Sequence, residues 1–248
     1  MKAMRSIPRE WCVASMIVAA AASLGASALP AQDDQLAERA KRAGEVLSEL
    51  TSVPDSAPPN ALLNEAVCVA VVPGVVQAGF GIGGKAGFGL VSCRTGTGWS
   101  WPSFVGLKGG SLGFQIGAQS ADVVLIFVNE NAPRTIAASS FDIGGEASVA
   151  AGPLGRAVSA ATDYRGQAEI YSYSKSKGLF AGIKIAGTKW ELDYTANKKA
   201  YASAPDSLRG GAHASVARQL RTNGSEAPAI VQPFLESLQK HVAKGPPG

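Results

Sequence analysis

The stretch that decides the fold is QAGFGIGGKAGFGLVSC, residues 77–93. Apolar residues alternate with glycine over most of its length, a pattern typical of half-buried strands that bend tightly. Short apolar runs divided by Gly, Pro and Ser continue on both sides of it. They predict strands near residues 67–72, 77–83, 86–93, 98–106, 111–119, 122–129, 141–150, 167–173, 179–186 and 188–194. Most connections are too short for crossover helices, so a largely antiparallel sheet is expected.

Helices are expected before and after the strand region. Residues 32–52 place apolar side chains at helical spacing, with Asp33 and Asp34 at the start, and 61–66 fits one more turn. Residues 131–139 fit a short helix or a loop. The segment 206–243 reads as helical with breaks near Gly224 and Pro228, and its apolar stripe is expected to pack on the sheet (Ile230, Phe234, Leu235 and Leu238). These patterns predict one α+β domain over 32–243 (core 60–204), with a curved or barrel-like sheet between N- and C-terminal helices.

Residues 79–86 also match two phosphate-binding signatures. Gly79, Gly81 and Gly84 fit G-x-G-x-x-G, and Gly84 with Lys85 fits the Walker A loop as far as its lysine. Both signatures need a helix after the loop, and Walker A needs Ser or Thr where Ala86 stands. A strand pattern follows instead. The glycines are therefore interpreted as residues of bent strands or a hairpin that allow close backbone contact.

The N-terminus resembles a secretory signal peptide at residues 1–28. A basic segment precedes an apolar run over 11–24, and Ala26-Ser27-Ala28 is a small-x-small cleavage pattern. Cleavage after Ala28 or Ala31, or retention as an uncleaved anchor, are the alternatives. The sequence predicts a periplasmic or secreted protein. In that oxidising location the Cys68 and Cys93 pair is expected to form a disulfide, the alternative being two buried thiols.

Composition argues against several classes of function. Lys and Arg exceed Asp and Glu by 23 to 19 without the dense basic clusters of nucleic-acid binders. The two histidines, His213 and His241, are far from the cysteines, so no metal site is expected. No nucleophile motif is present. Four carboxylates are better explained by turns and caps than by catalysis (Asp122, Glu130, Asp142 and Glu146). The expectation is a protein that is not an enzyme and uses no cofactor.

Several motifs in order resemble the SYLF domain, a lipid-binding module of yeast actin-patch proteins and their animal relatives. They are WSWPS at 99–103, GGSLGFQIG at 109–117, DVV at 122–124, SVAAGPLGR at 148–156 and IYSYSKSKGLFAG at 170–182. The resemblance covers residues 34–204 and implies binding of phosphoinositides and other anionic lipids. It also implies lipid contacts from an N-terminal amphipathic helix, which matches residues 32–52 here.

Charge distribution supplies the candidate lipid-binding residues. No Asp or Glu occurs in residues 66–121, where Lys85, Arg94 and Lys108 are the charged side chains. The candidates for anionic phospholipid head groups are Lys85, Lys108, Arg156, Lys175 and Lys177. Lys175 and Lys177 share strand parity with two tyrosines, Tyr171 and Tyr173, which are either an apolar floor of the site or core residues.

Two functions remain open at this stage. The first is non-catalytic binding of anionic membrane lipids by an exported domain. The second is a structural or protein-interaction module of the cell envelope, without a specific lipid ligand. Because export separates the domain from the cytoskeleton, actin is not an expected partner, and envelope proteins are possible ones.

Overall fold

Two long paired strands dominate the computed structural model, which describes residues 32–55, 57–138, 140–154, 168–176, 179–182, 185–209 and 213–242. Strand β1 (Cys68–Thr95) pairs antiparallel with β3 (Ser103–Phe127), from Cys68 opposite Phe127 to Val91 opposite Ser103. We refer to this pair as the ribbon. The predicted signal peptide, Arg156 and Lys177 lie outside the described residues.

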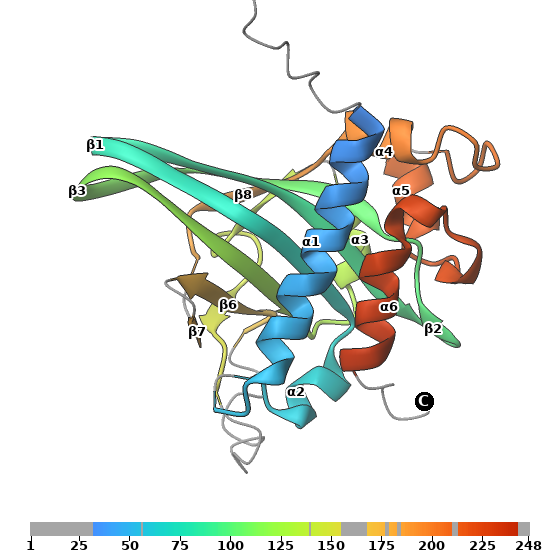
Figure 1. Cartoon of the computed structure of the whole chain (residues 1–248), viewed down its shortest axis with the longest axis horizontal. Coiled ribbons are helices and arrows are strands. Elements are labelled where there is room, and N and C mark those ends of the chain that lie inside the picture. The colour runs from blue at the N-terminus through green and yellow to red at the C-terminus, as the bar shows by residue number, and fades with distance from the viewer. Residues whose placement is uncertain are drawn as a thin grey trace, which may run out of the picture. The chain divides into compact units, whose positions relative to one another are not determined.

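The ribbon is folded back on itself. Cys68 and Cys93, close to the two ends of β1, form the predicted disulfide with their Cα atoms 3.9 Å apart. A straight strand would separate residues 25 positions apart by about 80 Å. Strand β1 therefore has an outward limb (68–79) and a return limb (83–95), and β3 follows the same path. Figure 1 shows the ribbon extending beyond the helices.

The six predicted strands between 67 and 129 are wrong in their boundaries. The break expected at 84–85 is absent, because Gly84 and Lys85 stay paired with Gly110 and Gly109. The break expected at 73–76 is an irregularity of register between Val72 and Val75, and a second irregularity lies between Gly79 and Gly81, inside the predicted strand 77–83. They bend the strand without ending it. Only the break around Thr97 separates elements, because it leads into the short β2 (Gly98–Trp99) that pairs with the end of β1.

Glycine allows the two limbs of β1 to touch. A Cβ atom on Gly89 would lie 2.0 Å from the carbonyl oxygen of Val71, and one on Gly87 would lie 2.7 Å from Cγ2 of Val75. No side chain fits at such distances. The glycine-rich stretch thus has the role in bent strands that its sequence context indicates.

Shorter strands extend the sheet from both limbs of β3. β6 (Ile170–Ser176) pairs with its last residues and β8 (Thr188–Leu192) with Val105–Gly109. β4 (Ser140–Ile143) pairs with β8, β7 (Leu179–Gly182) with β6, and β5 (Val149–Ala151) lies parallel to β6. All other pairings are antiparallel, so the curled, largely antiparallel sheet of an α+β fold is confirmed.

Two strands predicted nearer the C-terminus are also wrong in their extent. The predicted strand 141–150 is divided by a turn in which Gly144 has a φ of +90°, a left-handed conformation that favours glycine. The predicted strand 188–194 stops at Leu192, because Asp193 caps a helix, α4 (Tyr194–Ala200), by accepting a hydrogen bond from the Ala196 N–H.

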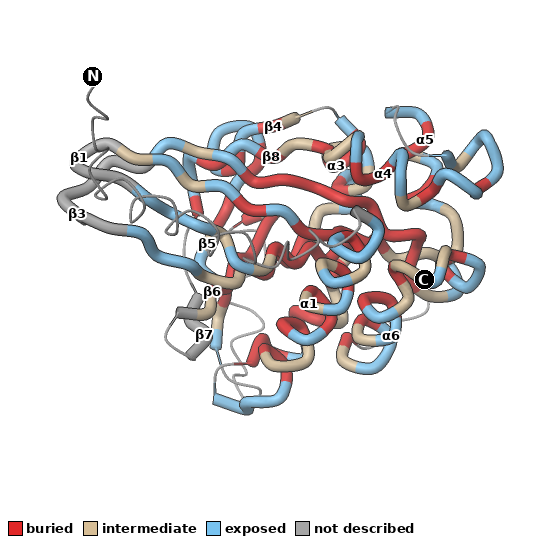
Figure 2. The backbone as a smooth tube through the Cα atoms, turned by 45° about the horizontal axis from the view of Figure 1, so that its top comes forward, coloured by how far each residue is buried: buried red, intermediate tan, exposed pale blue. Residues whose placement is uncertain are grey.

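Helices lie on both faces of the curled sheet. α1 (Gln32–Ser52) matches the prediction, and α2 (Asn60–Glu65) and α3 (Ala132–Ala137) occur where short turns were expected. The C-terminal segment contains α5 (His213–Gln219), two 3-10 turns (Gly224–Glu226 and Ala229–Val231) and α6 (Gln232–His241). Figures 1 and 2 show α1 and α6 side by side over the ribbon, with buried residues concentrated between helices and sheet.

The apolar stripe of α6 packs mainly on α1, not on the sheet as predicted. Phe234, Leu235 and Leu238 are buried in the same cluster as the apolar side of α1. The two helices approach closely because Gly44 lies at their contact, where a Cβ atom would be 2.7 Å from the Pro233 carbonyl oxygen. A second apolar cluster, around Trp190 and Leu125, fills the other face of the sheet.

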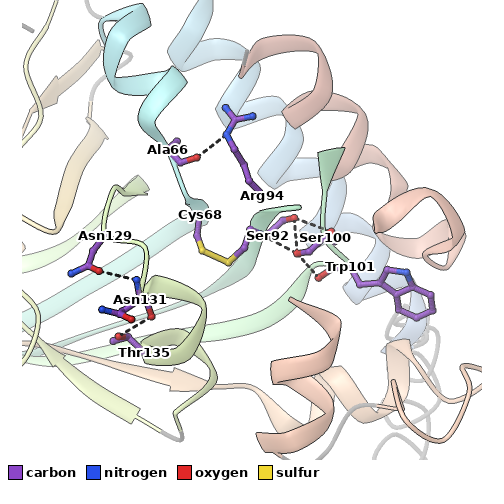
Figure 3. The surroundings of a disulfide bond; sticks show 10 residues. Ala66, Cys68, Ser92, Arg94, Ser100, Trp101, Asn129, Asn131 and Thr135 are labelled. Carbon is purple, nitrogen blue, oxygen red and sulfur yellow. Dashed lines mark hydrogen bonds between the residues drawn. A yellow bond between two sulfur atoms is a disulfide. The ribbon is translucent and has the colours of Figure 1, made fainter. Parts of the chain in front are cut away.

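Buried polar contacts fix the base of the ribbon beside the disulfide (Figure 3). Arg94 donates hydrogen bonds to the carbonyl oxygens of Ala66 (2.7 Å) and Leu63 (3.0 Å), and its guanidinium lies 4.6 Å from the centre of the Trp99 ring. Ser92 donates to the carbonyl of Ser100 at 2.8 Å. One of the three cations in the carboxylate-free stretch is therefore structural.

Candidate functional site

Lys175 lies beneath helix α1 in a network of charges. Its ammonium group pairs with the Glu49 carboxylate, and Arg42 pairs with Glu49 (3.3 Å) and with Asp122 (3.0 Å). The hydrogen bond from Lys175 lowers the pKa of Glu49. This network is partly exposed and joins α1 to β3 and β6, so the charge of Lys175 is paired with a carboxylate of the protein itself.

The tyrosines that share the parity of Lys175 are core residues. Tyr171 and Tyr173 are buried under α1, and the Tyr173 hydroxyl donates to the Pro153 carbonyl oxygen at 2.8 Å. Of the two alternatives for these tyrosines, the core interpretation is confirmed. Strand β6 pairs with β3, β5 and β7, so it is an interior strand and Lys175 does not protect an edge.

Lys85 and Lys108 lie together on the ribbon, apart from Lys175. Lys108 is opposite Ala86, the neighbour of Lys85, so the two lysines belong to adjacent strands and opposite faces. Lys108 forms an exposed ion pair with Glu191 at 2.7 Å. Lys85 is half-buried, which lowers its pKa, and forms no ion pair with a carboxylate of the described residues.

A groove that the sequence analysis missed lies where the ribbon passes beyond α1. It has a volume of about 520 Å³, and the two limbs of β1 and the polar side of α1 line it (Arg39, Arg42, Pro73, Val76, Ala86 and Phe88, among others). The guanidinium of Arg39 lies 5.1 Å from the centre of the Phe88 ring and pairs with Asp193 at 3.0 Å. Strand parity does not identify Phe88 as exposed, because Phe88 shares its parity with the buried Leu90.

Two of the four carboxylates considered for catalysis, Asp122 and Glu146, have structural contacts. Asp122 accepts from the Gly74 N–H (2.9 Å) and from Arg42. Glu146 accepts from the Asp142 N–H at 2.8 Å, within the turn after β4. In the part of the chain that the structure describes, no three His, Cys, Asp or Glu side chains group as metal ligands.

Over the same described residues, no helix is both long and apolar enough to cross a membrane. In the described residues, the ribbon of the curled sheet extends past the helices. It has the two lysines, Lys85 and Lys108, and the apolar groove beside α1.

Comparison with known proteins adds the family. A family model described as "Ysc84: Las17-binding protein actin regulator" matches residues 108–241, more than half of the chain. The SH3 domain-containing YSC84-like protein 1 of Xenopus laevis is 36% identical over 173 residues, which cover 67% of this chain and 51% of that protein. The Homo sapiens protein of the same name is 34% identical, with 67% and 50% coverage.

Protein YSC84 of Saccharomyces cerevisiae is 37% identical over 151 residues, which cover 59% of this chain and 32% of that protein. The chain thus spans about half, or less, of the length of these relatives. The matched region contains most of the motifs that resemble the SYLF domain. The chain belongs to the Ysc84 family of SYLF-domain proteins.

Proposed function

We propose that this domain binds anionic lipid surfaces, without catalysis, through the part of the ribbon that extends beyond α1. The observation that carries the proposal is the charge of the ribbon: residues 66–121 contain no carboxylate, although the chain has 19. Of the three cations there, Arg94 is held at the base by backbone carbonyls, and Lys85 and Lys108 lie on the extending part. Such a surface attracts the phosphate groups of lipids, and residues 66–121 contribute no carboxylate that would repel them.

The ion pair of Lys108 does not prevent this role. The side chains of Lys108 and Glu191 are both substantially exposed, and exposed pairs contribute little to stability. Lys108 can therefore exchange Glu191 for a lipid phosphate. Lys175 is a weaker candidate, because a lipid would have to compete with Glu49 inside the network beneath α1.

We include export in the proposal. The signal-peptide pattern at residues 1–28 supports it, and the Cys68–Cys93 disulfide is compatible with an oxidising compartment. In that location the partners are membrane lipids and envelope proteins. The family description names Las17 binding and actin regulation, and neither is part of the proposal for an exported chain.

The test is binding of the purified protein to liposomes of graded anionic content at low and moderate salt. The variant K85Q/K108Q removes two positive charges from the ribbon, and K198Q/K199Q removes two from the exposed side of α4. At about 1 kcal/mol per lysine near an anionic surface, the ribbon variant is expected to bind about thirty-fold more weakly. The α4 variant is expected to bind like the unchanged protein.

The two results separate the candidate functions. Affinity that rises with anionic lipid, falls with salt and depends on Lys85 and Lys108 supports lipid binding. An equal loss of liposome affinity in both double variants would mean that the net charge of the protein drives binding, without a particular site. Binding that ignores lipid charge would contradict the proposal and favour the envelope protein-interaction module.

A further inference from the structure

Two of the large apolar side chains that are exposed in the described part of the chain lie on the two limbs of β1, at the same groove. Val76 on the outward limb is 48% exposed and Phe88 on the return limb is 45% exposed. Helix α1 covers them only in part, because it presents polar side chains to this groove, among them Arg39 beside the Phe88 ring. Apolar groups at such a position indicate that something covers them when the protein functions.

We propose that the extending part of the ribbon, residues 76–88 and 106–120, enters the interfacial layer of an anionic bilayer, with Val76 and Phe88 in contact with acyl chains. This inference rests on the proposed function and specifies its geometry. It adds an apolar contribution to binding, which charge attraction alone would not provide.

The sequence of the extending part fits a lipid environment. Residues 76–84 and 109–121 contain no Lys, Arg, Asp or Glu. The charged positions that adjoin these two runs are Lys85 and Lys108 on one side and Asp122, paired with Arg42, on the other. Lysine has a long apolar stem, so it can stay at the level of the phosphates while neighbouring residues lie deeper.

The backbone of the ribbon also fits. Strands β1 and β3 are paired up to Gly79 opposite Gly117 and again from Gly81 opposite Gly113, with the irregularity of register between these two pairs. Paired N–H and C=O groups reduce the cost of leaving water, which otherwise keeps irregular backbone out of lipid. A bilayer is favoured over a protein partner because the charged residues within 76–88 and 106–120 are the two lysines Lys85 and Lys108. Lysine is depleted in protein interfaces and suited to anionic lipid.

The decisive experiment compares V76D with V53D. Val53, just after α1, is 46% exposed and so matches Val76 in residue type and exposure, but other residues line the groove. Both variants add the same negative charge to the protein. If the ribbon enters the bilayer, V76D is expected to bind anionic vesicles at least about tenfold more weakly than V53D.

A second measurement uses the fluorescence of an introduced tryptophan to report how deeply position 88 lies in the bilayer. Trp99, Trp101 and Trp190 are buried, so the fluorescence that F88W adds to the unchanged protein reports on position 88. Phosphatidylglycerol vesicles with brominated acyl chains are expected to quench the added signal of F88W and not that of V53W. Circular dichroism spectra like that of the unchanged protein would establish that each variant is folded.

The outcomes distinguish the two proposals. If the unchanged protein binds anionic vesicles and V76D equals V53D, with F88W unquenched, insertion is overturned while charge-driven binding stands. If the unchanged protein binds anionic vesicles no more tightly than neutral ones, whatever the salt concentration, both proposals fail together. Selective loss in V76D with quenching of F88W supports insertion.

Discussion

Cys68 and Cys93 bring the two ends of strand β1 together, with 3.9 Å between their Cα atoms. The disulfide therefore closes the base of a ribbon whose opposite end lies beyond the helices. In the unfolded chain it constrains a loop of 25 residues, and this constraint is the main source of its stabilisation in the chain-entropy model. The base of the ribbon is therefore covalently cross-linked by this disulfide.

Removing this bond should destabilise the protein while leaving the fold recognisable. For C68A/C93A we expect the free energy of unfolding to fall by about 3 kcal/mol, as estimated for a loop of this length. Urea unfolding of the oxidised protein and of the variant measures the difference. Reduction of the unchanged protein should give a similar loss, and a variant as stable as the oxidised protein would contradict the account.

Close contact between the limbs of β1 makes Gly89 intolerant of a side chain. A Cβ atom there would lie 2.0 Å from the Val71 carbonyl oxygen, so G89A must force the backbones apart. We expect a loss of about 3 kcal/mol or more, as for severe overpacking. Gly110, also in the ribbon, has nothing within 4 Å of its would-be Cβ, so G110A is the control and should change stability little. Equal effects in denaturant titrations would refute the contact.

Asn197 of α4 should be important for stability because its buried amide completes the hydrogen bonding of β3. Its oxygen accepts from the Phe104 N–H at 2.8 Å, and its nitrogen donates to the Phe104 carbonyl at 2.8 Å. N197A leaves the buried Phe104 N–H without this acceptor, and we expect a loss of about 3 kcal/mol. The thermal midpoint reports it, and a shift of less than a degree would show that the bonds contribute nothing net.

The network beneath α1 predicts a dependence of stability on pH. The pKa of Glu49 is lowered in the folded protein, chiefly by the hydrogen bond from Lys175. A lowered pKa contributes stability above the unfolded value, near 4.3, and this contribution disappears as the pH falls through the folded pKa. Because Glu49 and Arg42 are partly exposed, we expect no more than about 1 kcal/mol.

Denaturant midpoints between pH 3 and 7 check this dependence. The unchanged protein should lose more stability than E49Q as the pH falls from 5 to 3, since the variant has no carboxylate to protonate at this position. Parallel curves for the two proteins would show that the pair with Lys175 adds nothing. A steeper loss in E49Q would contradict the sign of the effect.

The sequence predicted the fold class because periodicity reports burial directly. Alternating apolar residues identified the strands, and helical spacing identified residues 32–52 as α1. The cysteine pair was predicted from its number and location. Periodicity does not report whether a glycine ends a strand or bends it, so Pro73-Gly74 and Gly84 were interpreted as breaks although β1 continues through both.

The candidate site was predicted less completely, because charge in a sequence does not show which charges pair. Lys85 and Lys108 lie together on the ribbon, but Lys175 reaches Glu49, a residue 126 positions away. Helix α4 was missed although Asp193 is a suitable cap, because the strand pattern before it extends to Tyr194. The groove at Phe88 depends on the crossing of two limbs, which no local pattern contains.

Hydrogen–deuterium exchange with and without anionic vesicles tests the central claim most directly, because it locates the contact with lipid along the chain. We expect slower exchange confined to residues 76–88 and 106–120, lost in K85Q/K108Q and unchanged in K198Q/K199Q. Neutral vesicles should give no protection. Protection of the solvent-facing side of α1 or α6 instead, with the ribbon unaffected, would contradict the account and move the lipid contact to the helices.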